Sequence, residues 1–97
     1  MGAGQIRPWA GVSGHHIELR PAVARALAQL DPVARRRVQG AIALLAQNPR
    51  PPAAIALRGR PGLRVRVGDY RVIYTVEDSI LLVLVITIGH RRDVYRQ

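Results

Sequence analysis

The chain has 97 residues and no cysteine, and its 15 basic residues against six acidic ones give a formal net charge of +9. This length predicts one domain, and the lack of cysteine excludes a disulfide framework, a thiolate metal site and cysteine catalysis. Every basic residue is an arginine, whose planar guanidinium suits forked contacts with phosphate or carboxylate. We therefore expect an acidic partner, such as nucleic acid, an anionic membrane or an acidic protein.

The sequence shows neither the pattern of a membrane-spanning helix nor that of a signal peptide. The longest apolar run, residues 80–88, is far shorter than the ~20 residues that a membrane-spanning helix needs. The N-terminus lacks the charged start, apolar stretch and cleavage site of a signal peptide. We expect a cytoplasmic protein with no membrane contact. Residues 1–14 contain four glycines and no hydrophobic period, which indicates a poorly ordered extension before a single domain at residues 15–97.

The first half of the domain has the pattern of a short strand and two helices. Residues 16–19 alternate weakly, which favours a strand, and Pro21 suits the first position of a helix, where a missing N–H costs nothing. Asp31 and Pro32 repeat the signal as the N-cap and first residue of a second helix. The proline-rich segment at residues 48–52 ends that helix. The pattern predicts a helical hairpin of about 9 and 16 residues.

The second half changes to the two-residue period of strands. Residues 63–67 alternate apolar residues with arginine, and residues 70–77 resume the alternation after Gly68 and Asp69. Residues 80–88 are almost entirely apolar, which predicts a strand at the sheet centre. These elements predict an α+β fold, with the helical hairpin packed on one face of a small, mainly antiparallel, four-stranded twisted sheet. The other face is expected to be free and rich in arginine.

Chemistry-bearing side chains are expected to gather on that free face. A face lined with guanidinium groups suits a polyanion, and an aromatic ring can stack on a base. A solvated basic face without chemistry is the alternative. The side chains expected to meet there are Arg64, Arg66, Arg71, His90, Arg91 and Tyr95.

The acid–base inventory favours metal-independent phosphoryl transfer on RNA. No carboxylate pair stands out, and the histidines lack a recognised metal spacing, so no metal or other cofactor is expected. The 2′-hydroxyl of RNA can attack the adjacent phosphate, and the protein must then neutralise the phosphorane and protonate the leaving 5′-oxygen. Arginine suits the first task but keeps its own proton. Histidine titrates near neutrality, so His90 is the candidate for proton transfer, with Tyr95 second.

Four segments occur in a characteristic order and spacing. They are Asn48-Pro-Arg-Pro, Leu57-Arg-Gly, RVRVGDYRVIY at residues 64–74 and IGHRRDVYR at residues 88–96. Together, from near residue 15 to the end of the chain, they resemble the RelE branch of the RelE/ParE toxin superfamily. The resemblance implies a RelE-like fold and a type II toxin. Such a toxin is a ribosome-dependent mRNA interferase that cleaves A-site codons beside 16S rRNA. A small, acidic cognate antitoxin neutralises it in a toxin–antitoxin hetero-oligomer.

The resemblance also implies roles for single residues. In the family, the matching positions orient the 2′-hydroxyl, stabilise the phosphorane and hold the codon; here they are Arg64, Arg66, Arg71, Arg91 and Tyr95. The best-studied members carry lysine at the first two of these positions, so we infer that the acid–base role has moved to His90 or rests on Tyr95. Further RNA contacts are expected from Arg58, Arg92 and Arg96.

Two other functions stay open. A ParE-like toxin uses the same scaffold without catalysis to poison DNA gyrase. It does not need the cluster of arginine, histidine and tyrosine, whose presence favours the ribonuclease. A plain RNA-binding module, or a degenerate toxin kept only as the partner of its antitoxin, is the third possibility.

Overall fold

The computed structural model describes residues 14–90, and its first half folds as the sequence predicts. Strand β1 (His16–Leu19) leads into helices α1 (Pro21–Gln29) and α2 (Pro32–Gln47). A proline opens each helix, and the Asp31 carboxylate caps α2 by accepting a hydrogen bond from the Ala34 N–H at 3.4 Å. Neither helix within these residues is long and apolar enough to cross a membrane.

The second half forms the rest of a mixed sheet whose strand order is β1-β5-β4-β3-β2. Strand β1 pairs in parallel with β5, and the other pairs are antiparallel. The elements after α2 are β2 (Ile55–Ala56), β3 (Leu63–Val67), β4 (Tyr70–Glu77), the 3₁₀ turn η3 (Asp78–Ile80) and β5 (Leu82–His90).

Two details differ from the sequence prediction. The sheet has five strands rather than four, because the two residues of β2 are too short to show an alternation. Strand β5 begins at Leu82 rather than at residue 80, because Asp78–Ile80 form a 3₁₀ turn that ends at Leu81 with a positive φ of 51°. Strand β5 is an interior strand with a neighbour on each side, but the central strand of the five is β4 rather than β5.

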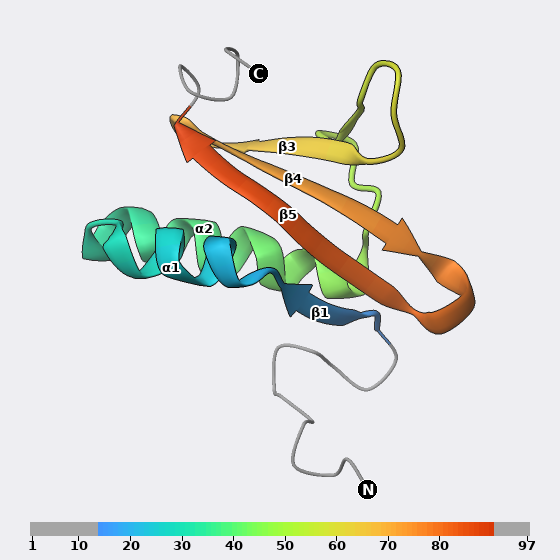
Figure 1. Cartoon of the computed structure of the whole chain (residues 1–97), viewed down its shortest axis with the longest axis horizontal. Coiled ribbons are helices and arrows are strands. Elements are labelled where there is room, and N and C mark those ends of the chain that lie inside the picture. The colour runs from blue at the N-terminus through green and yellow to red at the C-terminus, as the bar shows by residue number, and fades with distance from the viewer. Residues whose placement is uncertain (1–13, 91–97) are drawn as a thin grey trace, which may run out of the picture.

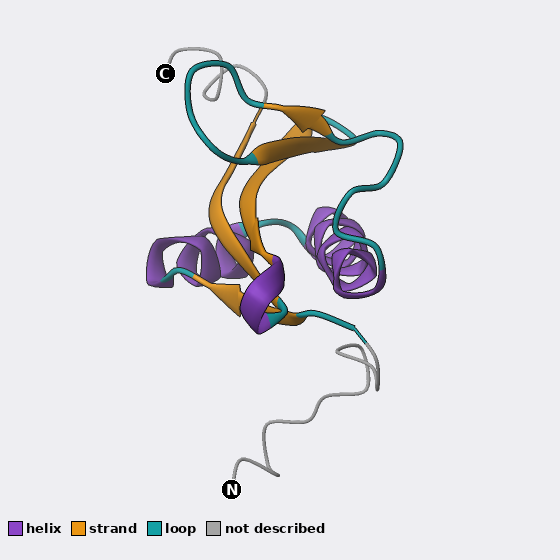
Figure 2. Ribbon diagram, turned by 90° about the vertical axis from the view of Figure 1, so that its right-hand side faces the viewer, coloured by secondary structure: helices purple, strands orange, loops and turns teal. Residues whose placement is uncertain are grey.

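Both helices lie side by side on one face of the sheet, as Figures 1 and 2 show. The core forms where their apolar stripes meet that face. Each fully buried valine or leucine contributes about 1.5–3 kcal/mol relative to an exposed one. The main contributors are Val23, Leu27, Val38, Ile42 and Leu45 from the helices, and Ile17, Val65, Val72, Tyr74, Val83 and Val85 from the sheet.

A β-bulge interrupts the pairing of β4 with β5. Ile73 pairs with Thr87, but the next residue of β4, Tyr74, pairs with Val85. Ile86 is therefore the extra residue of β5, and it reverses the alternation along that strand. In β5 the odd-numbered residues before Ile86, such as Val83 and Val85, face the helices. After Ile86 the even-numbered residues, such as Ile88, face them instead.

The turn between β3 and β4 depends on a glycine. Gly68 has a φ of 60° and is the first of the two loop residues, as in a type II′ hairpin turn. The turn closes on the pair Val67 and Tyr70, so the next pair outward is Arg66 and Arg71. The tight turn thus places two arginines directly opposite each other.

Candidate functional site

Three of the predicted arginines line one open pocket of about 340 Å³ on the sheet face away from the helices. We call it the arginine pocket, and the residues of the described range 14–90 that line it are Ala53, Ile55, Arg64, Arg66 and Arg71. The segment before β2, strand β2 itself, β3 and β4 all contribute to it.

The register of the sheet explains why these side chains meet. Residues directly opposite each other in an antiparallel ladder point to the same face. Arg66 pairs with Arg71, while Arg64 pairs with Ile73 on one side and with Ile55 on the other. The apolar residues between them, such as Val65 and Val72, point to the helices and fill the core.

The three arginines differ in exposure. Arg66 is exposed and Arg64 is half-buried, but Arg71 is only 4% exposed. Its strand neighbour Ile73 is 6% exposed on the same face, so the expectation of a wholly free face is wrong at these two positions. Cations that share a pocket raise the local positive potential, and a bound phosphate would relieve their repulsion.

His90 does not lie beside these arginines. It pairs with Tyr70 across the β4–β5 ladder, and the two rings meet edge to face with centroids 5.7 Å apart. Tyr70 shares the helix-facing side of β4 with Val72, so the His90 ring is on the opposite face from Arg71. The cause is the bulge at Ile86, because an uninterrupted alternation would have placed His90 on the arginine face.

His90 instead lines a second pocket of about 280 Å³, between the start of α2 and the β3–β4 turn. Besides apolar and backbone groups, this pocket holds cationic, anionic and aromatic side chains: Asp31, Arg37, Asp69, Tyr70 and His90. Its mixed charge makes it a poorer site for a polyanion than the arginine pocket.

The remaining predicted site residues are Arg58, which does not line the arginine pocket, and four residues of the C-terminal segment. Arg58 is exposed in the loop between β2 and β3. Residues outside the described range are Arg91, Arg92, Tyr95 and Arg96. Within residues 14–90 there is no group of three or more histidine, aspartate or glutamate side chains that could hold a metal ion.

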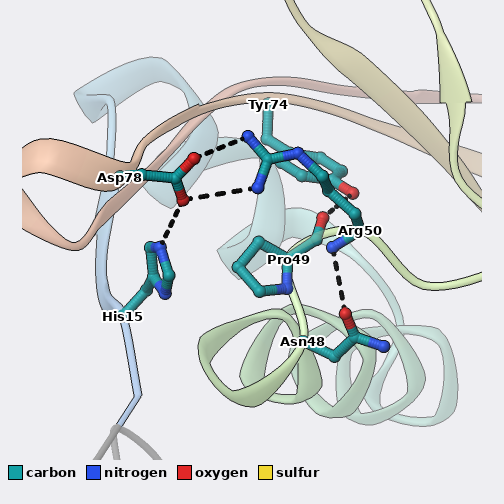
Figure 3. A network of polar contacts seen from close by, with 6 residues as sticks. All are labelled: His15, Asn48, Pro49, Arg50, Tyr74 and Asp78. Atoms are coloured by element: carbon teal, nitrogen blue, oxygen red, sulfur yellow. Dashed lines mark hydrogen bonds and ion pairs between the residues drawn. The ribbon is translucent and has the colours of Figure 1, made fainter.

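A polar network anchors the chain just before the pocket wall (Figure 3). The Arg50 guanidinium binds both carboxylate oxygens of Asp78, at 2.9 and 3.3 Å, and His15 Nε2 lies 3.0 Å from Oδ1 of the same carboxylate. The hydrogen bond from Arg50, followed by the contact with His15, holds the pKa of Asp78 below its ordinary value. The same pair raises the pKa of Arg50, so both groups stay charged over the whole neutral range.

Tyr74 adds a buried anchor to this network. Its hydroxyl donates a hydrogen bond of 2.6 Å to the Pro49 carbonyl, and burial raises the pKa of Tyr74. Since Ala53 and Ile55 follow shortly after Pro49 and Arg50, these contacts fix the start of the segment that forms one wall of the arginine pocket.

Sequence reasoning missed Ala53 and Ile55 as lining residues. The available signal was Ile55 itself, a large β-branched residue in a segment of proline and alanine that has no helical or strand period. It could not be placed in the pocket without knowing that residues 55–56 pair with β3.

Comparison with known proteins identifies the fold and the family. The family model described as "ParE toxin of type II toxin-antitoxin system, parDE" matches residues 17–95. No curated protein sequence matches the chain. Among solved structures, the archaeal RelE–RelB complex from Pyrococcus horikoshii OT3 is similar, with 27% identity over 80% of this chain and 96% of that chain, and a TM-score of 0.73.

Two further structures support the same fold. The toxin–antitoxin complex RelBE2 from Mycobacterium tuberculosis has 23% identity over 80% of this chain and 99% of that chain, with a TM-score of 0.70. The isolated E. coli RelE toxin has 22% identity over 84% of this chain and 97% of that chain, also with a TM-score of 0.70.

Proposed function

The chain belongs to the RelE/ParE superfamily of type II toxin–antitoxin toxins, and we propose that it is a ribosome-dependent endoribonuclease that cleaves mRNA in the A site. The observation that carries this proposal is the arginine pocket, in which Arg64, Arg66 and Arg71 line one cavity of about 340 Å³. A gyrase poison that acts only by binding has no need of such a pocket.

The reaction fits what arginine can do. The 2′-oxygen of one nucleotide attacks the neighbouring phosphorus, the bond to the 5′-oxygen breaks, and the products are a 2′,3′-cyclic phosphate and a 5′-hydroxyl. Negative charge accumulates on the phosphorane oxygens during this step. Guanidinium groups that are already in place can stabilise that charge through forked, charge-assisted hydrogen bonds.

Proton transfer needs another group, because arginine does not give up its proton. One proton must leave the 2′-hydroxyl and one must reach the 5′-oxygen. His90 faces the other side of the sheet, so within this proposal Tyr95, which lies outside the described residues, is the protein's remaining candidate. Arg91 is proposed to add a further charge at the phosphate, and Arg58, Arg92 and Arg96 to bind neighbouring RNA.

The proposed partners follow from charge and surface. A net charge of +9 suits the mRNA and 16S rRNA of the ribosomal A site. It also suits an acidic cognate antitoxin. The related P. horikoshii toxin forms a RelE–RelB complex, and we propose a toxin–antitoxin hetero-oligomer for this protein as well.

The test is end mapping in a translating extract. Purified full-length protein should cut a reporter mRNA within codons and leave 2′,3′-cyclic phosphate ends, whereas the same mRNA without ribosomes should stay largely intact. Arg64→Gln and Arg71→Gln should each lower cleavage by about 10²-fold or more, as does the loss of one preorganised donor elsewhere. The matched control is Arg25→Gln, which removes an exposed arginine of α1 with the same change in charge.

The alternative function is inhibition of DNA gyrase, and the match to the ParE family model favours it. In that case the protein should cause gyrase-linked DNA breaks and leave mRNA intact. The arginine substitutions would then change the activity no more than Arg25→Gln does.

A further inference from the structure

One large apolar side chain is exposed within the arginine pocket. Ile55 is 53% exposed, although it belongs to a strand and pairs with Arg64. Of the large apolar residues that are exposed in the described part of the chain, it is the one that lines this pocket. Burial in the fold therefore does not explain an isoleucine at this position.

Its position relative to the arginines suits a nucleotide. Side chains directly opposite each other across an antiparallel pair have Cβ atoms about 4.5–5.5 Å apart. The Ile55 side chain therefore starts next to the Arg64 side chain on the same face of the sheet, and both line one pocket with Ala53, Arg66 and Arg71. A nucleotide presents the same pair of chemistries, a flat apolar base face a short distance from a phosphate.

We propose that Ile55 and Ala53 form a nucleobase subsite, on which the base next to the arginine-bound phosphate lies with its face against the isoleucine side chain. The inference rests on the proposed function and extends it, because it assigns a base contact to a residue that does no chemistry. An aliphatic surface contacts the face of any base, so the subsite should hold the base without reading its hydrogen-bonding edge.

Binding to two oligonucleotides tests the subsite directly. The first probe is a six-nucleotide RNA whose 2′-O-methyl groups prevent cleavage, and the second has the same backbone without bases. Wild-type protein should bind the first more tightly in fluorescence anisotropy at low salt. Ile55→Ala should weaken binding of the first probe about fivefold, the effect of about 1 kcal/mol, and leave binding of the abasic probe unchanged.

Two further variants separate a base contact from a general effect. Ile80→Ala removes an isoleucine that is 65% exposed in η3, outside the arginine pocket, and it should change neither affinity. Ile55→Tyr offers an aromatic ring in a strand position, where such residues are well tolerated, and it should bind the RNA at least as tightly as the wild type. Thermal unfolding of each variant checks that the fold is kept.

The outcomes distinguish this inference from the proposed function. Equal affinity of the wild type for the two probes, or equal loss of both affinities in Ile55→Ala, overturns the subsite. Either result leaves the endoribonuclease proposal standing if the wild type still cuts mRNA in the translating extract. Failure to cut mRNA together with base-dependent binding would reject the nuclease and retain the subsite.

Discussion

Repulsion between the arginines of the arginine pocket should lower the free energy of unfolding, and the variant Arg66→Gln tests this. Arg66 and Arg71 face each other directly across the β3–β4 hairpin, and like charges in such a pair are destabilising. Coulomb's law gives two unit charges of the same sign about 6 Å apart a repulsion of about 0.7 kcal/mol in bulk water and about 3 kcal/mol at an effective dielectric of about 20. Arg66 is exposed, so the lower value is the better guide.

We therefore expect Arg66→Gln to raise the free energy of unfolding by about 0.5–1 kcal/mol. For a domain of this size the gain corresponds to a rise in Tm of roughly 2–8 °C. The same substitution should reduce mRNA cleavage, because it removes one guanidinium from the pocket. A variant that is more stable and less active is the expected trade-off at a site preorganised for charge.

The assay is thermal unfolding in about 0.05 M and about 1 M salt, over which the screening length falls roughly from 14 to 3 Å. The gain of Arg66→Gln should shrink at high salt. Arg25→Gln lowers the net charge by the same amount from an exposed site on α1, so it corrects for general repulsion. If Arg66→Gln is no more stable than Arg25→Gln at low salt, the reasoning about the opposed pair is refuted.

Three further predictions concern the anchors and the predicted proton donor. Tyr74→Phe should lower the free energy of unfolding by about 1–3 kcal/mol in urea titration, because it leaves the buried Pro49 carbonyl without its hydroxyl donor; an unchanged midpoint would contradict this. The carboxylate of Asp78 has a lowered pKa in the folded state, so its stabilising effect is present above the ordinary value of 3.8 and is lost as the pH falls through the lower folded value. Wild-type protein should accordingly lose more stability than Asp78→Asn between about pH 5 and pH 3, and parallel pH profiles would argue against the Arg50 pairing. His90→Gln should keep mRNA cleavage within about threefold of wild type, a change of well under the roughly 1.4 kcal/mol that a tenfold loss of rate represents, because the His90 ring lies on the opposite face of the sheet from the arginine pocket. A loss of about 10²-fold or more would show that His90 reaches the reacting atoms.

Local signals in the sequence predicted most of the fold. Three local signals depend on neighbouring residues alone: the prolines at the starts of both helices, the Asp31 cap, and the alternation of apolar residues with arginine in β3 and at the start of β4. Elements of this kind can be assigned with no knowledge of the rest of the chain. Strand β2 could not be assigned in this way, because its two residues become a strand only by pairing with β3.

The candidate site was predictable to the extent that it follows from alternation. Arg64, Arg66 and Arg71 share a face because β3 and β4 form a regular hairpin with a two-residue turn. Ile55 was missed because it reaches the pocket only through the pairing of β2 with β3. The burial of Arg71 was missed as well, since alternation gives the face of a residue but not what covers it.

The position of His90 shows how one inserted residue changes the chemistry that a strand offers. Residues in β5 are apolar on both faces, so the sequence contains no break in pattern at Ile86, and the bulge arises from how β5 pairs with β4. As a consequence, the ring of His90 packs edge to face against Tyr70, on the opposite face of the sheet from Arg71. In the proposed reaction the pocket supplies fixed positive charge, and the group that exchanges protons comes from elsewhere in the chain or from the ribosome. Such a division would by itself make cleavage of free mRNA slow, because guanidinium groups stabilise the phosphorane but neither deprotonate the 2′-hydroxyl nor protonate the 5′-oxygen.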